Sequence, residues 1–127
     1  NVADTSLLKK VPGIGSYFAR QIVNYRTRLG GFCNTRQLLE IEGFPEEALT
    51  YFSLPPRDAS QIHRLPINKL SISQLKRHPY MGYYRARAIA DYRRLKGPIH
   101  RLEDLGMLKD FTPEAIERLK PYVSFEE

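Results

Sequence analysis

The feature that most constrains this chain is an internal repeat that keeps one register. Pro12 aligns with Pro79, which sets an offset of 67 residues (79 − 12). The same offset then pairs, without a gap, Gly15 with Gly82, Arg20 with Arg87, Ile22 with Ile89, Tyr25 with Tyr92, Gly30 with Gly97, Leu38 with Leu105 and Phe44 with Phe111. A repeat of this length predicts one supersecondary unit used twice.

The segment between the two copies is rich in proline and predicts a linker. Residues 53–66 contain three of the chain's nine prolines, and proline-rich stretches separate folded units. We therefore expect a first unit over 1–53, a linker over 54–66 and a second unit over 67–127. Ile62 and Leu65 are apolar, so we expect the units to touch.

Within each copy the signals predict a short helix, a turn, a long helix and two shorter helices. Apolar residues recur at helical spacing in the first long helix, and we expect the same role for a set in the second. Those residues are Phe18, Ile22, Tyr25 and Leu29, then Ala88, Ile89, Tyr92 and Leu95. Asn1 and Asn68 are predicted to cap the first helices, and Gly30-Gly31 and Gly97-Pro98 end the long ones. No alternating strand pattern competes, so the predicted fold class is all-α.

Charge favours an anionic partner such as nucleic acid over an acidic substrate. The 127 residues include 20 Lys and Arg against 14 Asp and Glu, a formal net charge of +6. The charge is also segregated, because no acidic residue lies between Lys9 and Arg36, and Asp91 stands alone between Lys69 and Arg101. A solvated helix normally mixes both signs, so these halves indicate a basic face that meets an anion.

The turn Pro12-Gly13-Ile14-Gly15 lies between two predicted helices. A Gly-x-Gly turn at a helix N-terminus leaves backbone amides uncovered beside the positive end of the helix dipole, where they can bind a phosphate oxygen. Ile14 is expected to point inward and lock the turn. The alternative is a plain tight turn between antiparallel helices.

The first copy contains, in order, an Asn, a Leu seven residues later, Pro-Gly-Ile-Gly, then Ala, Ile, Tyr-Arg and a Leu-rich second half. This pattern resembles the helix-hairpin-helix family, and in particular the DNA-binding domains of ComEA-type competence proteins. The resemblance implies two packed helix-hairpin-helix units, each a SAM-like bundle of four to five helices, that grip the DNA backbone without reading sequence and perform no catalysis. The residues expected to contact DNA are Lys9, Lys10, Gly13, Ile14, Gly15, Arg20, Arg77, Gly82, Arg85 and Arg87.

The chain departs from the family pattern at three of its four turns. Tyr80 stands where the first glycine of the second hairpin is expected, which predicts a poorer phosphate clamp there. The turns Glu42-Gly43-Phe44-Pro45 and Lys109-Asp110-Phe111-Thr112 lack one or both glycines, and Pro45 has no amide to donate. These two turns are predicted to be structural.

The sequence gives little support for catalysis, a metal or a cofactor. His63, His78 and His100 are scattered and expected at the surface, and Cys33, the one cysteine, excludes an internal disulfide and is expected to be buried or idle. Acidic pairs such as Glu46-Glu47 and Glu103-Asp104 are expected at helix starts, where they favour the dipole. We therefore expect no enzyme activity, no cofactor and no small-molecule substrate.

Aromatic residues near both hairpins are the second feature that points to a partner. Phe18, Tyr25 and Tyr92 are expected in the core, whereas Tyr17, Tyr80 and Tyr83 are equally compatible with burial and with stacking on bases or a partner protein.

Three functions therefore stay open. They are DNA binding in uptake or repair, a protein-interaction scaffold of the same fold, and a module appended to a nuclease. No apolar stretch reaches the length of a membrane span, so no membrane contact is expected from this segment. The chain begins at Asn1 without a Met, which is compatible with the loss of an export signal or anchor, so the compartment stays open.

Overall fold

The computed structural model describes residues 1, 3–53 and 62–126. The chain forms two compact units, Asn1–Ile62 (unit 1) and His63–Glu127 (unit 2). Helices dominate both units, and the only strands among the described residues are two of two residues each. The predicted all-α class is therefore confirmed.

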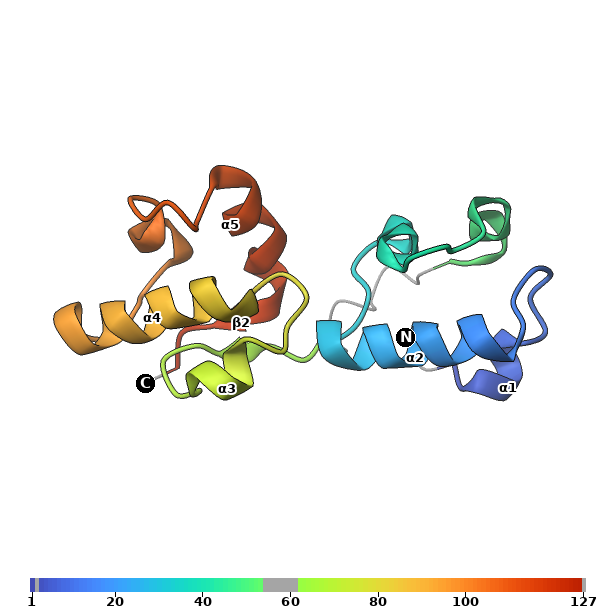
Figure 1. Ribbon diagram of the computed structural model, residues 1–127, viewed down its shortest axis with the longest axis horizontal. Coiled ribbons are helices and arrows are strands. Elements are labelled where there is room, and N and C mark those ends of the chain that lie inside the picture. Colours follow the sequence, from blue (N-terminus) through green and yellow to red (C-terminus); the bar gives the residue numbers. More distant parts are fainter. Residues whose placement is uncertain (2, 54–61, 127) are drawn as a thin grey trace. The chain divides into compact units, whose positions relative to one another are not determined.

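Unit 1 is built around its longest helix. It contains α1 (Thr5–Leu8), α2 (Ser16–Leu29) and two 3-10 helices, η1 (Thr35–Glu40) and η2 (Glu46–Tyr51). Figure 1 shows α1 beneath the N-terminal end of α2 and the two 3-10 helices above it. The face of α2 that these neighbours cover carries Ala19, Ile22 and Leu29, each at most 2% exposed. The predicted periodicity of this helix thus produces the core of unit 1.

Unit 2 repeats this arrangement and adds a closing strand pair (Figure 1). Its helices are α3 (Ile72–Leu75), α4 (Gly82–Lys96), η4 (Leu102–Leu105), α5 (Pro113–Leu119) and η5 (Lys120–Tyr122). The strands β1 (Leu65–Pro66) and β2 (Val123–Ser124) pair in parallel. The last residues of the predicted linker 54–66 are therefore part of unit 2, because the chain end offers Leu65 a backbone partner; residues 54–61 lie outside the described residues.

The predicted helix caps at Asn1 and Asn68 are wrong. The first helix of each unit is capped by Asp4 and Ser71, three residues further along. The two asparagines instead each bind the chain that follows the long helix: the Asn1 amide bonds both the carbonyl and the N–H of Phe32, at 2.9 and 2.7 Å. Asn68 makes the same pair of bonds to Ile99. Each asparagine thus pairs two backbone groups that are partly buried, and such groups need a partner within the protein because water cannot serve them fully. We call this pair of bonds the clamp.

The predicted apolar stripe of α4 is partly wrong. Ala86 and Ile89 are completely buried, whereas Leu95 is 71% exposed. At the repeat offset Ala86 and Ile89 correspond to Ala19 and Ile22, but Leu95 corresponds to Arg28, one residue before the buried Leu29. One residue along a helix turns a side chain by about 100°, which carries Leu95 out of the core.

All four turns between helices share one hydrogen bond. The amide of a buried apolar residue donates to the carbonyl three residues before it, at 3.0–3.1 Å. The pairs are Ile14 to Val11, Phe44 to Ile41, Met81 to His78 and Phe111 to Leu108. The turns that contain Phe44 and Phe111 therefore keep the hairpin fold although they lack one or both glycines.

The repeated Tyr-Arg pair places an arginine inside each unit. Arg26 Nη1 donates to the Ala3 carbonyl at 2.8 Å, and Arg93 Nη1 donates to the equivalent Leu70 carbonyl at 2.5 Å. Each arginine thus ties the start of its unit to the long helix. The charge count from sequence assigns both to a basic face, but their guanidinium groups bind the backbone.

Candidate nucleic-acid interface

The hairpin of unit 1 presents backbone donors at its exposed tip. Gly13 adopts a φ of 88°, which side-chain-bearing residues rarely do, and the Ile14 side chain is 4% exposed, as expected. The Ile14 amide is used within the turn. The amides of Gly13, Gly15 and Ser16, in contrast, donate to no other residue that the structure describes.

The same hairpin leads into the N-terminus of a long helix. Gly15 is the N-cap of α2, a helix of 14 residues, with extended backbone (φ −93°, ψ −169°) and no capping side chain. No acidic residue lies in the first turn. The uncapped amides and the positive end of the dipole therefore coincide, which is the arrangement that binds anions.

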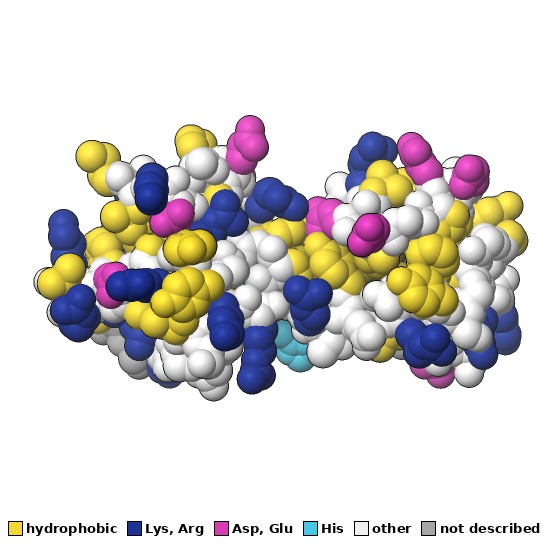
Figure 2. Space-filling view, in the orientation of Figure 1, with side chains coloured by type: hydrophobic (Ala, Val, Ile, Leu, Met, Phe, Trp, Pro, Cys, Tyr) yellow, Lys and Arg dark blue, Asp and Glu magenta, His cyan; other side chains and the backbone are white. Residues whose placement is uncertain are grey.

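Lysine and arginine side chains lie on both sides of this hairpin in the sequence. Lys9, Lys10 and Arg20 are exposed, and no carboxylate in the described part of the chain forms an ion pair with any of them. Figure 2 shows Lys and Arg side chains spread over the surface of each unit. The predicted residues Lys9, Lys10, Gly13, Gly15 and Arg20 thus belong to one hairpin region.

In the hairpin of unit 2, a side chain of the turn itself binds one of the backbone amides. The Tyr80 amide, equivalent to that of Gly13, donates to His78 Nδ1 at 3.0 Å. Tyr80 does not take a positive φ; in this hairpin Gly82 does so instead, at 72°. Substituting tyrosine for glycine has therefore changed the backbone path, and one donor of the turn is already bound.

The Tyr80 ring fills the space behind that turn. It is 5% exposed and packs edge-on against the rings of His78 and Tyr122, with centroids 5.5 and 5.8 Å away. The Arg118 guanidinium carbon lies 4.0 Å from the ring centroid, a cation–π contact. Tyr80 is thus a core residue, and the expectation that His78 lies at the surface is wrong because its imidazole is needed inside the turn.

The predicted contact residues of unit 2 differ in how available they are to a ligand. Arg85 is half-buried, with Nε 2.7 Å from the Asp110 carbonyl and Nη1 2.7 Å from the Tyr80 carbonyl. Arg87 lies 3.9 Å from Asp91. Gly82 is half-buried at the start of α4, and Arg77 remains exposed.

The turns at 42–45 and 109–112 are unsuited to binding phosphate. Pro45 removes a donor before η2, and Glu46 and Glu47 place negative charge in its first turn. In unit 2 the Thr112 side chain already accepts from the Ala115 amide, and Pro113 has no N–H. Their described contacts are those of structural turns.

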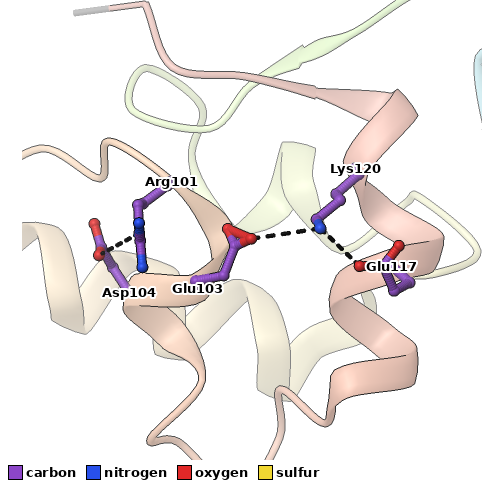
Figure 3. Close-up of polar contacts among 5 residues, drawn as sticks. All are labelled: Arg101, Glu103, Asp104, Glu117 and Lys120. Carbon is purple, nitrogen blue, oxygen red and sulfur yellow. Dashed lines mark hydrogen bonds and ion pairs between the residues drawn. The ribbon is translucent and has the colours of Figure 1, made fainter.

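A charge cluster on unit 2 joins η4 to α5 (Figure 3). Lys120 Nζ lies 3.4 Å from Glu103 and 2.6 Å from Glu117, and Arg101 lies 3.5 Å from Asp104. A backbone hydrogen bond, and then Lys120, lower the pKa of Glu103, while Glu117, and then Glu103, raise the pKa of Lys120. Glu103 and Asp104 lie in the first turn of η4, as expected from the sequence.

The remaining aromatic and titratable residues sort by exposure. Tyr17 is 57% and Tyr83 46% exposed, while Phe18, Tyr25 and Tyr92 are half-buried. Cys33 is exposed rather than buried.

Among the described residues, no three His, Cys, Asp or Glu side chains gather as metal ligands, and none of the helices is both long and apolar enough to cross a bilayer.

Comparison with known proteins gives one family and one distant relative. The model of the helix-hairpin-helix motif matches residues 1–52 and 60–124. A Xenopus laevis protein named endonuclease/exonuclease/phosphatase family domain-containing protein 1 is 24% identical over 145 aligned positions, which cover 97% of this chain and 26% of that protein. No solved structure matches significantly.

Proposed function

Because the chain belongs to the helix-hairpin-helix family, with two tandem copies of the motif, we propose that it binds DNA through the sugar-phosphate backbone without reading sequence. The module binds and does not catalyse. The observation that carries the proposal is the hairpin of unit 1, where a helix N-terminus coincides with amides and cations that have no partner among the described residues.

The proposed mechanism is electrostatic. The amides of Gly13, Gly15 and Ser16 donate to phosphate oxygens, and Lys9, Lys10 and Arg20 supply the counter-charge. Contacts to phosphate position a protein on the duplex but carry no base information. Unit 1 is therefore the gripping unit, and unit 2, with its Tyr80 amide bound to His78, contributes less.

The biological setting is a further part of the proposal. This chain spans about a quarter of the relative that it matches, 26%, and the name of that relative includes a nuclease and phosphatase family domain. A module that holds DNA for a neighbouring catalytic domain, as in repair, fits that name. DNA uptake, as in ComEA-type competence proteins, is the other setting that the family resemblance supports.

A substitution at the first position of α2 tests the hairpin amides. Ser16→Pro removes one proposed donor, yet proline is favoured at the first helical position, and the extended Gly15 before it suits a following proline. Ser16→Ala keeps the amide and is the matched control. Loss of a hydrogen bond to a charged group costs about 1.5–3 kcal/mol, so Ser16→Pro should weaken duplex binding roughly 10- to 100-fold.

Fluorescence anisotropy of a labelled random-sequence duplex, titrated across a salt series, is the measurement. Wild type and Ser16→Ala should bind alike, with affinity that falls steeply as salt rises. Equal binding by the proline variant would remove the hairpin from the mechanism. No binding by wild type to duplex, single-stranded DNA or RNA at low salt would leave the protein-interaction alternative.

A further inference from the structure

The C-terminal half of α4 forms one wall of an open groove on unit 2. The other wall is the turn before α5. Ala88, Tyr92 and Leu95 face Leu108 and Lys109 across a volume of about 330 Å³. We call this the α4 groove. It lies on α4 away from the buried Ala86 and Ile89, so the fold of the unit does not fill it.

Further exposed apolar side chains lie close in sequence to those that line the groove. Leu95 is 71% exposed, and Tyr84, one helical turn before Ala88, is 73% exposed. Next to Leu108, itself 37% exposed, Met107 is 96% exposed. Single exposed apolar side chains are ordinary, but apolar side chains that line an open groove favour an interaction site. Figure 2 shows hydrophobic side chains lying among Lys and Arg side chains over this helix.

Charge around the α4 groove is positive on balance. Asp91 is already paired with both Arg87 and Arg94. Lys96 and Lys109 line the groove, and no carboxylate among the described residues pairs with either. Asp110 is the remaining acid in the wall. The rim therefore offers two lysines whose charges a partner can neutralise.

We propose that the α4 groove docks an acidic amphipathic helix of a partner protein. Apolar side chains at helical spacing would lie against Ala88, Tyr92 and Leu95, and Asp or Glu at the edges would meet Lys96 and Lys109. Apolar walls suit such a helix better than a phosphate backbone, which has no apolar side chains to bury. The inference does not depend on DNA binding by unit 1, and it gives the two units different partners.

The probe is a phage-displayed library of random 16-residue peptides, selected on the whole 127-residue chain. Enriched peptides are then measured by anisotropy against three variants. Leu95→Ser removes a groove side chain that is largely exposed, so folding should be preserved, and thermal unfolding checks this. The double variant Lys96→Glu, Lys109→Glu reverses the rim. Tyr51→Ser removes an exposed aromatic side chain of unit 1 (60% exposed) and is the control.

The expected result is enrichment of peptides with apolar residues at i, i+3, i+4 and i+7 flanked by Asp or Glu. Their binding should weaken at least 10-fold in Leu95→Ser and in the charge-reversed variant, and should be unchanged in Tyr51→Ser. No enrichment, enrichment without acidic residues, or equal binding to Leu95→Ser would overturn the proposal. Competition of the selected peptides by duplex DNA in the Ser16→Pro background would overturn it too, because the groove would then be a nucleic-acid surface.

Discussion

At the scale of single residues, the matched asparagines Asn1 and Asn68 do not cap a helix, although their residue type and their place ahead of a helix suggest that role. An Asn ahead of a helix is a common cap, but Asn68 reaches 31 residues along the chain to Ile99. Its amide offers both a donor and an acceptor, which are needed to bind the N–H and the carbonyl of one residue at once. Ser71 or Asp4 meets the simpler demand of a cap.

The clamp predicts a specific loss of stability. Asn68→Ala leaves the partly buried N–H and carbonyl of Ile99 without their partner, so the free energy of unfolding should fall by about 1–3 kcal/mol. Asn68→Asp keeps the acceptor for the Ile99 N–H and loses the donor, and should fall between wild type and Ala. Urea unfolding followed by circular dichroism measures all three. Equal stabilities would show that the hydrogen bonds of Asn68, including the one its amide donates to the Phe125 carbonyl, contribute nothing.

At the scale of elements, the two main hairpins differ although their turns share the same hydrogen bond. In unit 1 the first turn position is Gly13, and its amide has no partner among the described residues. In unit 2 that position is Tyr80, whose ring is buried and whose amide is bound by His78. The first turn position is thus a glycine with an uncovered amide in unit 1 and a packed core residue in unit 2, where Arg85 also ties the turn to the next hairpin.

The contact between η4 and α5 predicts how stability depends on pH. The lowered pKa of Glu103 means that its contribution is present above its ordinary value of 4.5 and is lost as pH falls below it. The raised pKa of Lys120 means that its contribution is present below 10.5 and is lost as pH rises through its higher folded value. Urea unfolding should therefore show stability declining at both extremes.

Lys120→Met is the matched variant for this contact, because it keeps the aliphatic stem and removes the charge. The stability difference between wild type and Lys120→Met should be largest near neutral pH and should shrink below pH 4.5 and above pH 10.5. A difference that is constant with pH would mean that the ion pairs of Figure 3 do not contribute to folding.

At the scale of the whole molecule, the two units use their positive charge differently. In unit 1 the exposed cations of the hairpin region have no carboxylate partner among the described residues. In unit 2 most are already engaged: Arg85 and Arg93 bind backbone carbonyls, and others pair with acids. The pairs are Lys69 with Glu126, Arg87 and Arg94 with Asp91, and Arg101 with Asp104. Unit 2 has the larger excess of cations, 13 Lys and Arg against 8 Asp and Glu, compared with 7 against 6 in unit 1, but more of its cations are already bound within the unit.

This asymmetry gives a charge-matched test. Lys9 and Lys10 correspond at the repeat offset to Lys76 and Arg77, and all four are exposed. Lys9→Ala with Lys10→Ala should weaken duplex binding and lower the salt slope by about 2, because each lysine neutralises about one phosphate. Lys76→Ala with Arg77→Ala removes the same charge and should change the slope by less than about 1. Equal effects would show that both hairpins grip DNA.

The sequence by itself determined the repeat, the helical class and the inward face of α2, because periodicity and the offset of 67 residues are local or linear properties of the chain. It also identified the hairpin of unit 1, since glycine spacing reports the backbone path directly. Only the tertiary structure decided where several side chains lie and which groups they contact. It placed His78 on the Tyr80 amide, turned Arg26, Arg85 and Arg93 inward to carbonyls, and carried Leu95 out to the α4 groove. The His78 contact spans only two residues, but it depends, like the others, on the folded path of the chain, and a linear pattern does not specify which partner a side chain will meet.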